Sequence, residues 1–200
     1  DVSVDESKDA NDNETQMTMI MEMQEQIKNA DNPPNQVEAL RRLRQVLCQH
    51  KPPIEFILRD AMIIPTIIQF LHNSDERVKL DALWCLTNIA TGTQTEAFNV
   101  LHAVPDLLNI ISGEDLSLAE QACWCIGNLA GDSDESRLYL FQNGILEALF
   151  DHIIILGPML ERFYENKQNE SYEQWLPPAR MVAFAISNLT RGNTSGYKFI

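Results

Sequence analysis

The chain has 200 residues, 44% of them hydrophobic, and a formal net charge of −14. This length is enough for a domain with a sizeable core, and the composition excludes a chain that is disordered throughout. No apolar run approaches the roughly 18 residues of a transmembrane helix, and the acidic balance argues against nucleic acid as a ligand and favours a cationic partner.

The first part of the chain is acidic, with nine acidic and two basic residues in 1–31. We expect residues 1–16 to form an acidic disordered tail, because they are polar and show little periodicity. Residues 17–34 are expected to form a short Met-rich helix and a linker, with the helix packing on the first repeat or forming a Met-rich groove for a partner. Asn35, after two prolines, is the expected N-cap of the next helix.

Residues 35–200 are expected to form helical repeats. A first helix at 36–49 is followed by a repeated pattern of a short, a medium and a long helix. The expected helices lie at 54–60, 63–71 and 76–91, at 93–101, 105–111 and 116–130, and at 135–142, 144–155 and 180–191. Trp84 and Trp124 are 40 residues apart, as are Pro65 and Pro105. This period predicts an all-α fold, an armadillo-type α-solenoid with three-helix repeats in a right-handed superhelix.

The spacing between the second and third long helices is greater than the spacing between the first and second. Trp124 and Phe184 are 60 residues apart, an excess of about 20 over the period. We place the extra residues in an insertion at about 156–178, which contains Gly157-Pro158 and Trp175-Leu-Pro-Pro178. Insertions in solenoids project from one face and often contact a partner. After the third long helix, residues 193–200 are expected to begin an incomplete fourth repeat.

Each long helix of the three repeats carries an aromatic residue followed four positions later by Asn. The pairs are Trp84 and Asn88, Trp124 and Asn128, and Phe184 and Asn188. Residues i and i+4 share one helix face, and a period of 3.6 residues places the first two pairs opposite the apolar stripe. We therefore expect an exposed, working face; the alternative is that a second helix layer covers it.

The cysteines and histidines do not suggest catalysis or metal binding. Three cysteines, Cys85, Cys123 and Cys125, lie inside expected helices, where free Cys acts as a small apolar residue. The Cys-x-Cys spacing does not match a zinc site, and a reducing compartment is expected. The histidines lie at expected helix ends or loops, without a nucleophile or carboxylate constellation. We expect a non-enzymatic protein with no cofactor and no metal.

The two segments that carry the Trp and Asn pairs resemble importin α, the armadillo adaptor of nuclear import. They are Ala82-Leu-Trp-Cys-Leu-Thr-Asn-Ile-Ala-Thr-Gly92 and Glu120-Gln-Ala-Cys-Trp-Cys-Ile-Gly-Asn-Leu-Ala-Gly-Asp132, and Lys51-Pro-Pro-Ile-Glu-Phe-Ile-Leu-Arg59 resembles the family too. The resemblance implies that extended Lys- and Arg-rich peptides, the nuclear localisation signals of cargo proteins, bind along the concave side.

The resemblance also implies roles for individual residues. The Asn side chains would bond the peptide backbone, and neighbouring rings would form slots for Lys or Arg stems. Asp132 would select lysine, helped by the Gly92 carbonyl and a hydroxyl of Thr93 or Thr95, with Gln121 beside the same groove. Phe184 stands where the third Trp is expected, which makes that slot weaker.

Partners and location follow from the same resemblance. The family occupies the cytoplasm and nucleus and binds importin β through a basic N-terminal arm, which would lie upstream of the acidic residues 1–31. Two other interpretations stay open. The first is a structural armadillo scaffold within a large cytoskeletal or ciliary assembly, using the groove or the insertion for a fixed partner. The second is a signalling scaffold of the β-catenin kind, which the Asn pairs and Asp132 disfavour.

Overall fold

A computed structural model describes residues 3–165 and 176–191, and every regular element in these two ranges is a helix. The helices are α1 (Ser3–Lys28), α2 (Pro33–Leu47), α3 (Ile54–Ile57), α4 (Ile63–Gln69), the 3-10 helix η1 (Phe70–His72), α5 (Glu76–Ile89), α6 (Gln94–Val100), the 3-10 helix η2 (Leu101–Ala103), α7 (Val104–Ile111), α8 (Leu116–Asp132), α9 (Asp134–Gln142), α10 (Ile145–Glu165) and α11 (Leu176–Leu189).

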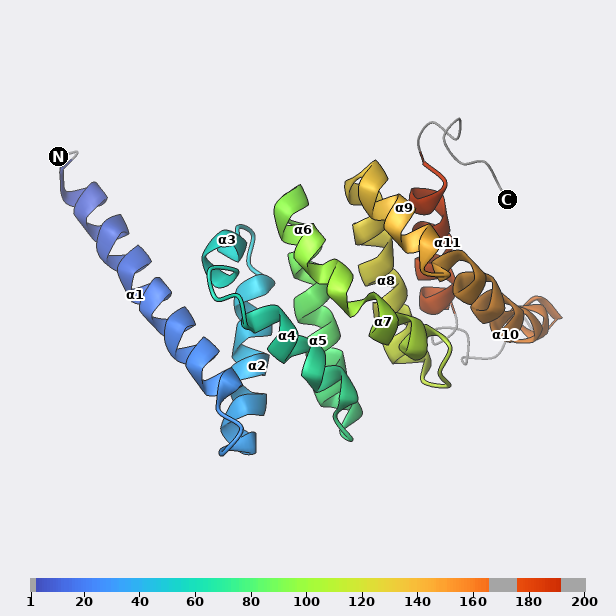
Figure 1. Cartoon of the computed structure of the whole chain (residues 1–200), viewed down its shortest axis with the longest axis horizontal. Coiled ribbons are helices and arrows are strands. Elements are labelled where there is room, and N and C mark those ends of the chain that lie inside the picture. Colours follow the sequence, from blue (N-terminus) through green and yellow to red (C-terminus); the bar gives the residue numbers. More distant parts are fainter. Residues whose placement is uncertain (1–2, 166–175, 192–200) are drawn as a thin grey trace.

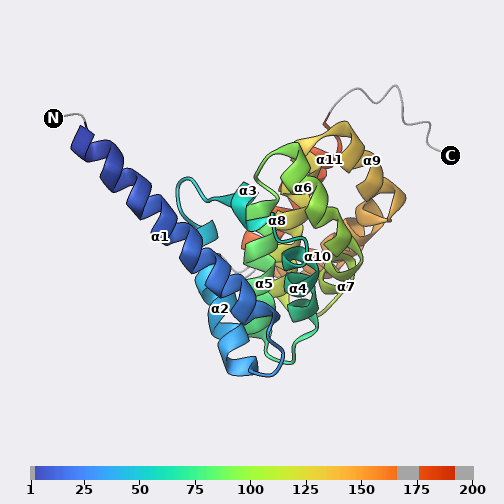
Figure 2. The same ribbon diagram turned by 60° about the vertical axis from the view of Figure 1, so that its left-hand side comes forward.

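The helices form the predicted repeats. In the first two repeats a short, a medium and a long helix follow one another, whereas in the third repeat α10, with 21 residues, is longer than α11, with 14. Helices α2, α5, α8 and α11, which we call the long helices, lie side by side in one layer and run in the same direction, and the other helices of the repeats cover them on one side (Figure 1). The turned view in Figure 2 shows α1 extending beyond α2 at the start of the array. The all-α, armadillo-type solenoid is confirmed.

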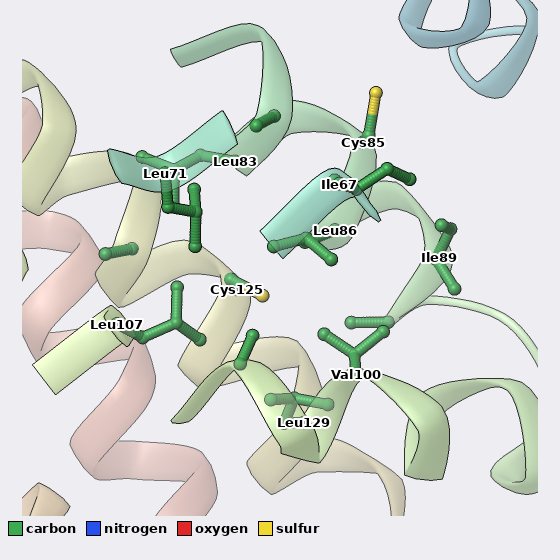
Figure 3. Close-up of a cluster of buried hydrophobic side chains, with 14 of the residues drawn as sticks. Ile67, Leu71, Leu83, Cys85, Leu86, Ile89, Val100, Leu107, Cys125 and Leu129 are labelled. Carbon is green, nitrogen blue, oxygen red and sulfur yellow. The ribbon is translucent and has the colours of Figure 1, made fainter. Parts of the chain in front are cut away.

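A single apolar core runs between the two layers, from Ile20 to Leu189. Figure 3 shows its central part, where Leu71, Leu86, Leu107 and Leu129 converge from η1, α5, α7 and α8. Burying one such side chain contributes about 1.5–3 kcal/mol relative to leaving it exposed. Because every repeat shares this core with its neighbours, the spacing of the long helices is fixed by packing.

An Asp side chain caps the amino-terminal end of α5 and of α8. The Asp75 carboxylate accepts from the Arg77 N–H at the start of α5, and Asp115 does the same from Leu118 at the start of α8. The prediction for α2 was displaced by a few residues. Its N-cap is Asn32 instead of Asn35, because the two prolines that follow Asn32 need no backbone N–H in the first helical turn.

The structure differs from the expected disordered tail at residues 1–16. Helix α1 begins at Ser3 and continues to Lys28, so the Met-rich segment is the second half of a longer helix. Residues 1–31 contain no Gly or Pro, the two residues that disfavour helix most, and from Met17 onward they are rich in Met, Glu and Gln, which favour helix. From Ile20 onward the helix packs on α2, burying Ile20, Met23 and Ile27.

The region expected to be an insertion is partly helical. Helix α10 does not end at residue 155 but continues through Pro158 to Glu165, and α11 already begins at Leu176. Two prolines stand in the first turn of α11, where they are tolerated. The rest of the expected insertion, 166–175, and the expected fourth repeat at 193–200 lie outside the described residues.

Candidate functional site

The four long helices present equivalent positions to one side of the array. Positions i, i+3 and i+7 share one face of a helix, and the 40-residue period relates these positions between α2, α5 and α8. We call the following twelve residues the ladder face: Arg41, Arg44 and Cys48 of α2; Asp81, Trp84 and Asn88 of α5; Gln121, Trp124 and Asn128 of α8; Met181, Phe184 and Asn188 of α11.

The rings and amides of α5 and α8 reach the surface of this face. Trp84, Asn88, Trp124 and Asn128 are half-buried, whereas the residues on either side of each are buried. The predicted orientation away from the apolar stripe is therefore confirmed, and among the described residues no second helix layer covers these four side chains.

The two tryptophan rings contact each other directly. Their centroids lie 5.4 Å apart and their planes cross at 67°, an edge-to-face arrangement. A methylene stem stacked between two rings needs about twice the van der Waals contact distance of 3.5–4.0 Å. The slot expected between neighbouring Trp rings is thus closed in this structure, and one ring has to rotate before a lysine stem can enter.

The asparagines form a ladder of bonds between repeats. Asn128 Nδ2 donates to the Thr87 carbonyl of α5 at 3.1 Å, and Asn188 Nδ2 donates to the Gly127 carbonyl of α8 at 2.8 Å. Asn88 donates to the Trp84 carbonyl one turn earlier, at 3.0 Å, in its own helix. All of these bonds use Nδ2, so the Oδ1 atoms of the half-buried Asn88 and Asn128 can still accept a hydrogen bond from a ligand.

In the third pair the ring is exposed but the amide is buried. Phe184 is 36% exposed, but Asn188 is only 5% exposed because α11 packs closely on α8. The close approach occurs at Gly127, where an added Cβ would overlap the Phe184 ring. Asn188 therefore stabilises the contact between α8 and α11, and little of its side chain can be reached by a ligand.

Gln121 does not lie open to a groove as the sequence suggested. It is 4% exposed, and its Nε2 donates to the Thr87 hydroxyl at 2.8 Å. That hydroxyl in turn donates to the Leu83 carbonyl at 2.8 Å. Because α5 packs against this side of α8, Gln121 joins the two helices and is corrected from a ligand-facing residue to a buried one.

Asp132 is the last residue of α8, where a turn was expected. Its carboxylate is half-buried and accepts from the Ser136 hydroxyl at 3.3 Å, and Ser136 accepts from the Ser133 hydroxyl at 3.0 Å. The Arg137 guanidinium binds the Ala130 carbonyl at 2.8 Å and so caps the end of α8. The carboxylate is therefore held by the Ser136 hydroxyl at the carboxyl end of the helix.

Gly92 and Thr93 lie at the same edge of the array, at the end of α5. They line a shallow depression of about 620 Å³ together with the loop that follows α2, and its walls include the carboxylates of Glu55 and Glu96. The Thr93 hydroxyl accepts from the Glu96 N–H as the cap of α6, while Thr95 is exposed. Asp132 is not among the residues that line this depression.

Arg41, Arg44 and Asp81 form an ion-pair cluster on the ladder face, which the sequence pattern indicated only in part. Arg44 Nε lies 2.9 Å from Asp81 Oδ1 and Arg41 Nε lies 3.6 Å from Asp81 Oδ2, joining α2 to α5. Counting back 40 residues from Trp84 to Arg44 could have placed these arginines on the same face as the rings.

Three of the cysteines and one histidine are buried inside the helices. Cys85, Cys123 and Cys125 are buried as predicted, and burial raises the pKa of the Cys123 and Cys125 thiols to about 12. His152 was expected at a helix end but is buried in α10; burial lowers its pKa more than the nearby Ile111 backbone raises it. In residues 3–165 and 176–191, no three His, Cys, Asp or Glu side chains are grouped to hold a metal ion.

None of the described helices is by itself long and apolar enough to cross a bilayer. One pair, α9 with residues 145–158 of α10, reaches the threshold in length and composition, but it is bent by 68°.

Comparisons with known proteins identify the repeat family and several relatives. The armadillo/beta-catenin-like repeat family matches residues 50–91 and 94–131. Importin subunit alpha-9 of Arabidopsis thaliana is 34% identical over 163 residues, covering 80% of this chain and 28% of that protein. The probable importin subunit alpha-A of Dictyostelium discoideum is 30% identical, covering 77% and 28%. The chain is an importin-α-like armadillo-repeat protein. It spans less than a third of the length of these two relatives.

Solved structures of armadillo proteins share the fold of this importin-α-like chain. A designed armadillo repeat protein in complex with the peptide (KR)4 gives a TM-score of 0.65 at 22% identity, covering 84% of this chain and 62% of that one. Computationally designed armadillo repeat proteins for modular peptide recognition give a TM-score of 0.65 at 20% identity, covering 88% and 65%. At these identities the likeness concerns the fold.

Proposed function

We propose that this chain is a non-enzymatic adaptor whose ladder face binds extended Lys- and Arg-rich peptides, the nuclear localisation signals of proteins carried into the nucleus. The observation that carries the proposal is the repetition of a ring and an amide, half-exposed and in register, on the adjacent helices α5 and α8. The whole protein would then work in the cytoplasm and nucleus, with importin β as partner if a basic arm lies upstream.

The ladder face offers what an extended basic peptide requires. Such a peptide has free backbone N–H groups, and the Oδ1 atoms of Asn88 and Asn128 can accept from them. The Trp84 and Trp124 rings can attract a Lys or Arg side chain by a cation–π contact, worth about 0.5–2 kcal/mol. The chain is also acidic overall, with a net charge of −14, which favours encounter with a cationic ligand.

Asp132 supplies the charge that would select lysine. A carboxylate at the carboxyl end of a helix faces the negative end of the helix dipole, which costs about 0.3–1 kcal/mol. Asp132 nevertheless occupies this position at the end of α8, held by Ser136. An ammonium group beside it would offset that cost, and a charge-assisted hydrogen bond of this kind contributes about 1.5–3 kcal/mol.

The test is binding of the chain to a fluorescent Lys-rich peptide, measured by anisotropy at two salt concentrations. We expect Asp132→Asn to weaken binding about tenfold or more and higher salt to weaken binding by the unchanged chain. Asp151→Asn is the matched control, since Asp151 is an exposed acid on α10, away from the ladder face. Absence of binding by the folded chain, or equal loss in both variants, would refute the proposal.

A second candidate is a structural armadillo scaffold within a large cytoskeletal or ciliary assembly. One observation favours it. Helix α10 exposes four large apolar side chains that no described element covers: Phe150, Ile153, Ile154 and Ile155. Exposed apolar patches of this kind mark protein contacts. If Ile154→Asp abolishes capture of a partner while the Lys-rich peptide does not bind, the scaffold is the better interpretation.

A further inference from the structure

We propose that Arg41 and Arg44 form a subsite for an acidic residue of the bound peptide, so that the ladder face selects a basic segment flanked by a carboxylate. This inference rests on the proposed function, because it concerns the same peptide on the same face. It adds a specificity-determining pair that the ring and amide pattern alone does not contain.

The position of these arginines is the first argument. Arg44 and Cys48 of α2 lie 40 residues before Trp84 and Asn88, so α2 continues the ladder face with a cation and a thiol in place of a ring and an amide. Cys48 Sγ even receives a hydrogen bond from Asn88 Nδ2 at 3.5 Å, which joins the two helices at this register. A peptide that follows the face past α5 therefore meets Arg44 next.

The pairing of Asp81 is the second argument. Its carboxylate is 11% exposed and lies between the two guanidinium groups, so it is unable to serve as an acid for a peptide lysine. Arg41 also binds Glu38, through a terminal nitrogen at 2.8 Å. Arg44 uses Nε for Asp81, and within the described residues no ion pair or hydrogen bond occupies its two terminal nitrogens.

The exposure of the side chains is the third argument. Arg44 is 32% exposed and Arg41 is 43% exposed, although both are anchored to the buried Asp81. An arginine held by one carboxylate and open on its outer edge is suited to accept a second carboxylate, because its donors form a rigid planar fork. A lysine at the same place would meet like charge and find no free acid.

The repeat spacing gives the register of the acidic residue. Packed helices lie about 8–10 Å apart, and an extended peptide advances about 3.3 Å per residue, so one repeat corresponds to about three residues. A carboxylate at Arg44 should therefore lie about three residues from the lysine at Trp84 and about six from the lysine at Trp124. Both chain directions satisfy this spacing and both have to be tested.

The experiment uses labelled peptides with a four-lysine core and alanine spacers, carrying Glu, Ala or Lys three or six positions from the core on either side. We expect the chain to bind one Glu peptide about tenfold more tightly than its Lys counterpart, with Ala between them. Arg44→Gln and Arg41→Gln should remove this preference. Arg42→Gln is the matched control on the same helix, off the ladder face, and should keep it.

Two further measurements keep the outcomes distinct. Since Arg44→Gln leaves Asp81 with one partner fewer, the double variant Arg44→Gln/Asp81→Asn is tested beside it, and circular dichroism confirms that each variant folds. Asp132-dependent binding with equal affinity for the Glu, Ala and Lys peptides would overturn this inference alone. Binding of none of the peptides would overturn both this inference and the proposed function.

Discussion

The buried hydrogen bond between Gln121 and Thr87 offers a sharp test of the interface between α5 and α8. Substituting Thr87→Val removes the hydroxyl that accepts from Gln121 Nε2 at 2.8 Å but keeps nearly the same shape. Both side chains are buried, at 2% and 4% exposure, so water cannot readily replace the lost acceptor. The Gln121 amide is then left with an unsatisfied donor inside the solenoid.

The expected cost follows from that unsatisfied donor. Leaving a buried polar group without a partner destabilises a protein by about 1–3 kcal/mol, whereas replacing both partners by apolar groups of similar shape is nearly neutral. We therefore expect Thr87→Val to lower the free energy of unfolding by about 2 kcal/mol. The double variant Thr87→Val/Gln121→Met should recover most of this loss.

Urea unfolding followed by circular dichroism measures the effect for the two single variants and the double variant. A loss below about 0.5 kcal/mol for Thr87→Val, or purely additive losses in the double variant, would refute the assignment of this bond as a structural link. The same variants separate structure from binding. If Gln121 is buried as described, Gln121→Met should leave the affinity for a Lys-rich peptide unchanged while the fold persists.

Three further predictions concern packing, capping and pH. Gly127→Ala should destabilise the chain by about 1–3 kcal/mol through overlap with the Phe184 ring, and Phe184→Ala should relieve it, as measured by urea unfolding. Asp115→Ala should cost about 1 kcal/mol by removing the cap of α8, whereas Asp115→Asn should cost little. Partial burial raises the pKa of Asp60, but the Lys28 hydrogen bond, the Met62 N–H and the charge of Lys28 together lower it below its ordinary value. The stability from this pair is therefore present above the ordinary Asp pKa and lost as pH falls through the folded-state value; Lys28→Met should remove that loss in acid titrations.

The repeat architecture was predictable because it is written in local patterns. The apolar stripe and the ring and amide pairs depend on residues within one helix, and the 40-residue period is the regular recurrence of these patterns along the chain; the structure agrees with all three. Such features follow from helix geometry and from the need to bury one face.

The contacts between helices were not predictable in the same way. Gln121 lies on the same side of α8 as Trp124 by angle, but only the packing of α5 shows that it is covered. The contact between Trp84 and Trp124 likewise depends on the distance between two helices. For α1, the count of charges suggested disorder, while the absence of helix-breaking residues was the feature that agreed with the structure.

The closed contact between the two tryptophans sets how binding energy has to be distributed along the ladder face. Separating an edge-to-face pair gives up about 0.5–1.5 kcal/mol, and a lysine that replaces one ring contributes a similar cation–π energy of about 0.5–2 kcal/mol. A single ring slot therefore provides little net affinity. The peptide has to gain its affinity from several contacts together: the carboxylate at Asp132, the Oδ1 atoms of Asn88 and Asn128, and the charge at the α2 end. A face built in this way discriminates a run of correctly spaced charges from an isolated lysine.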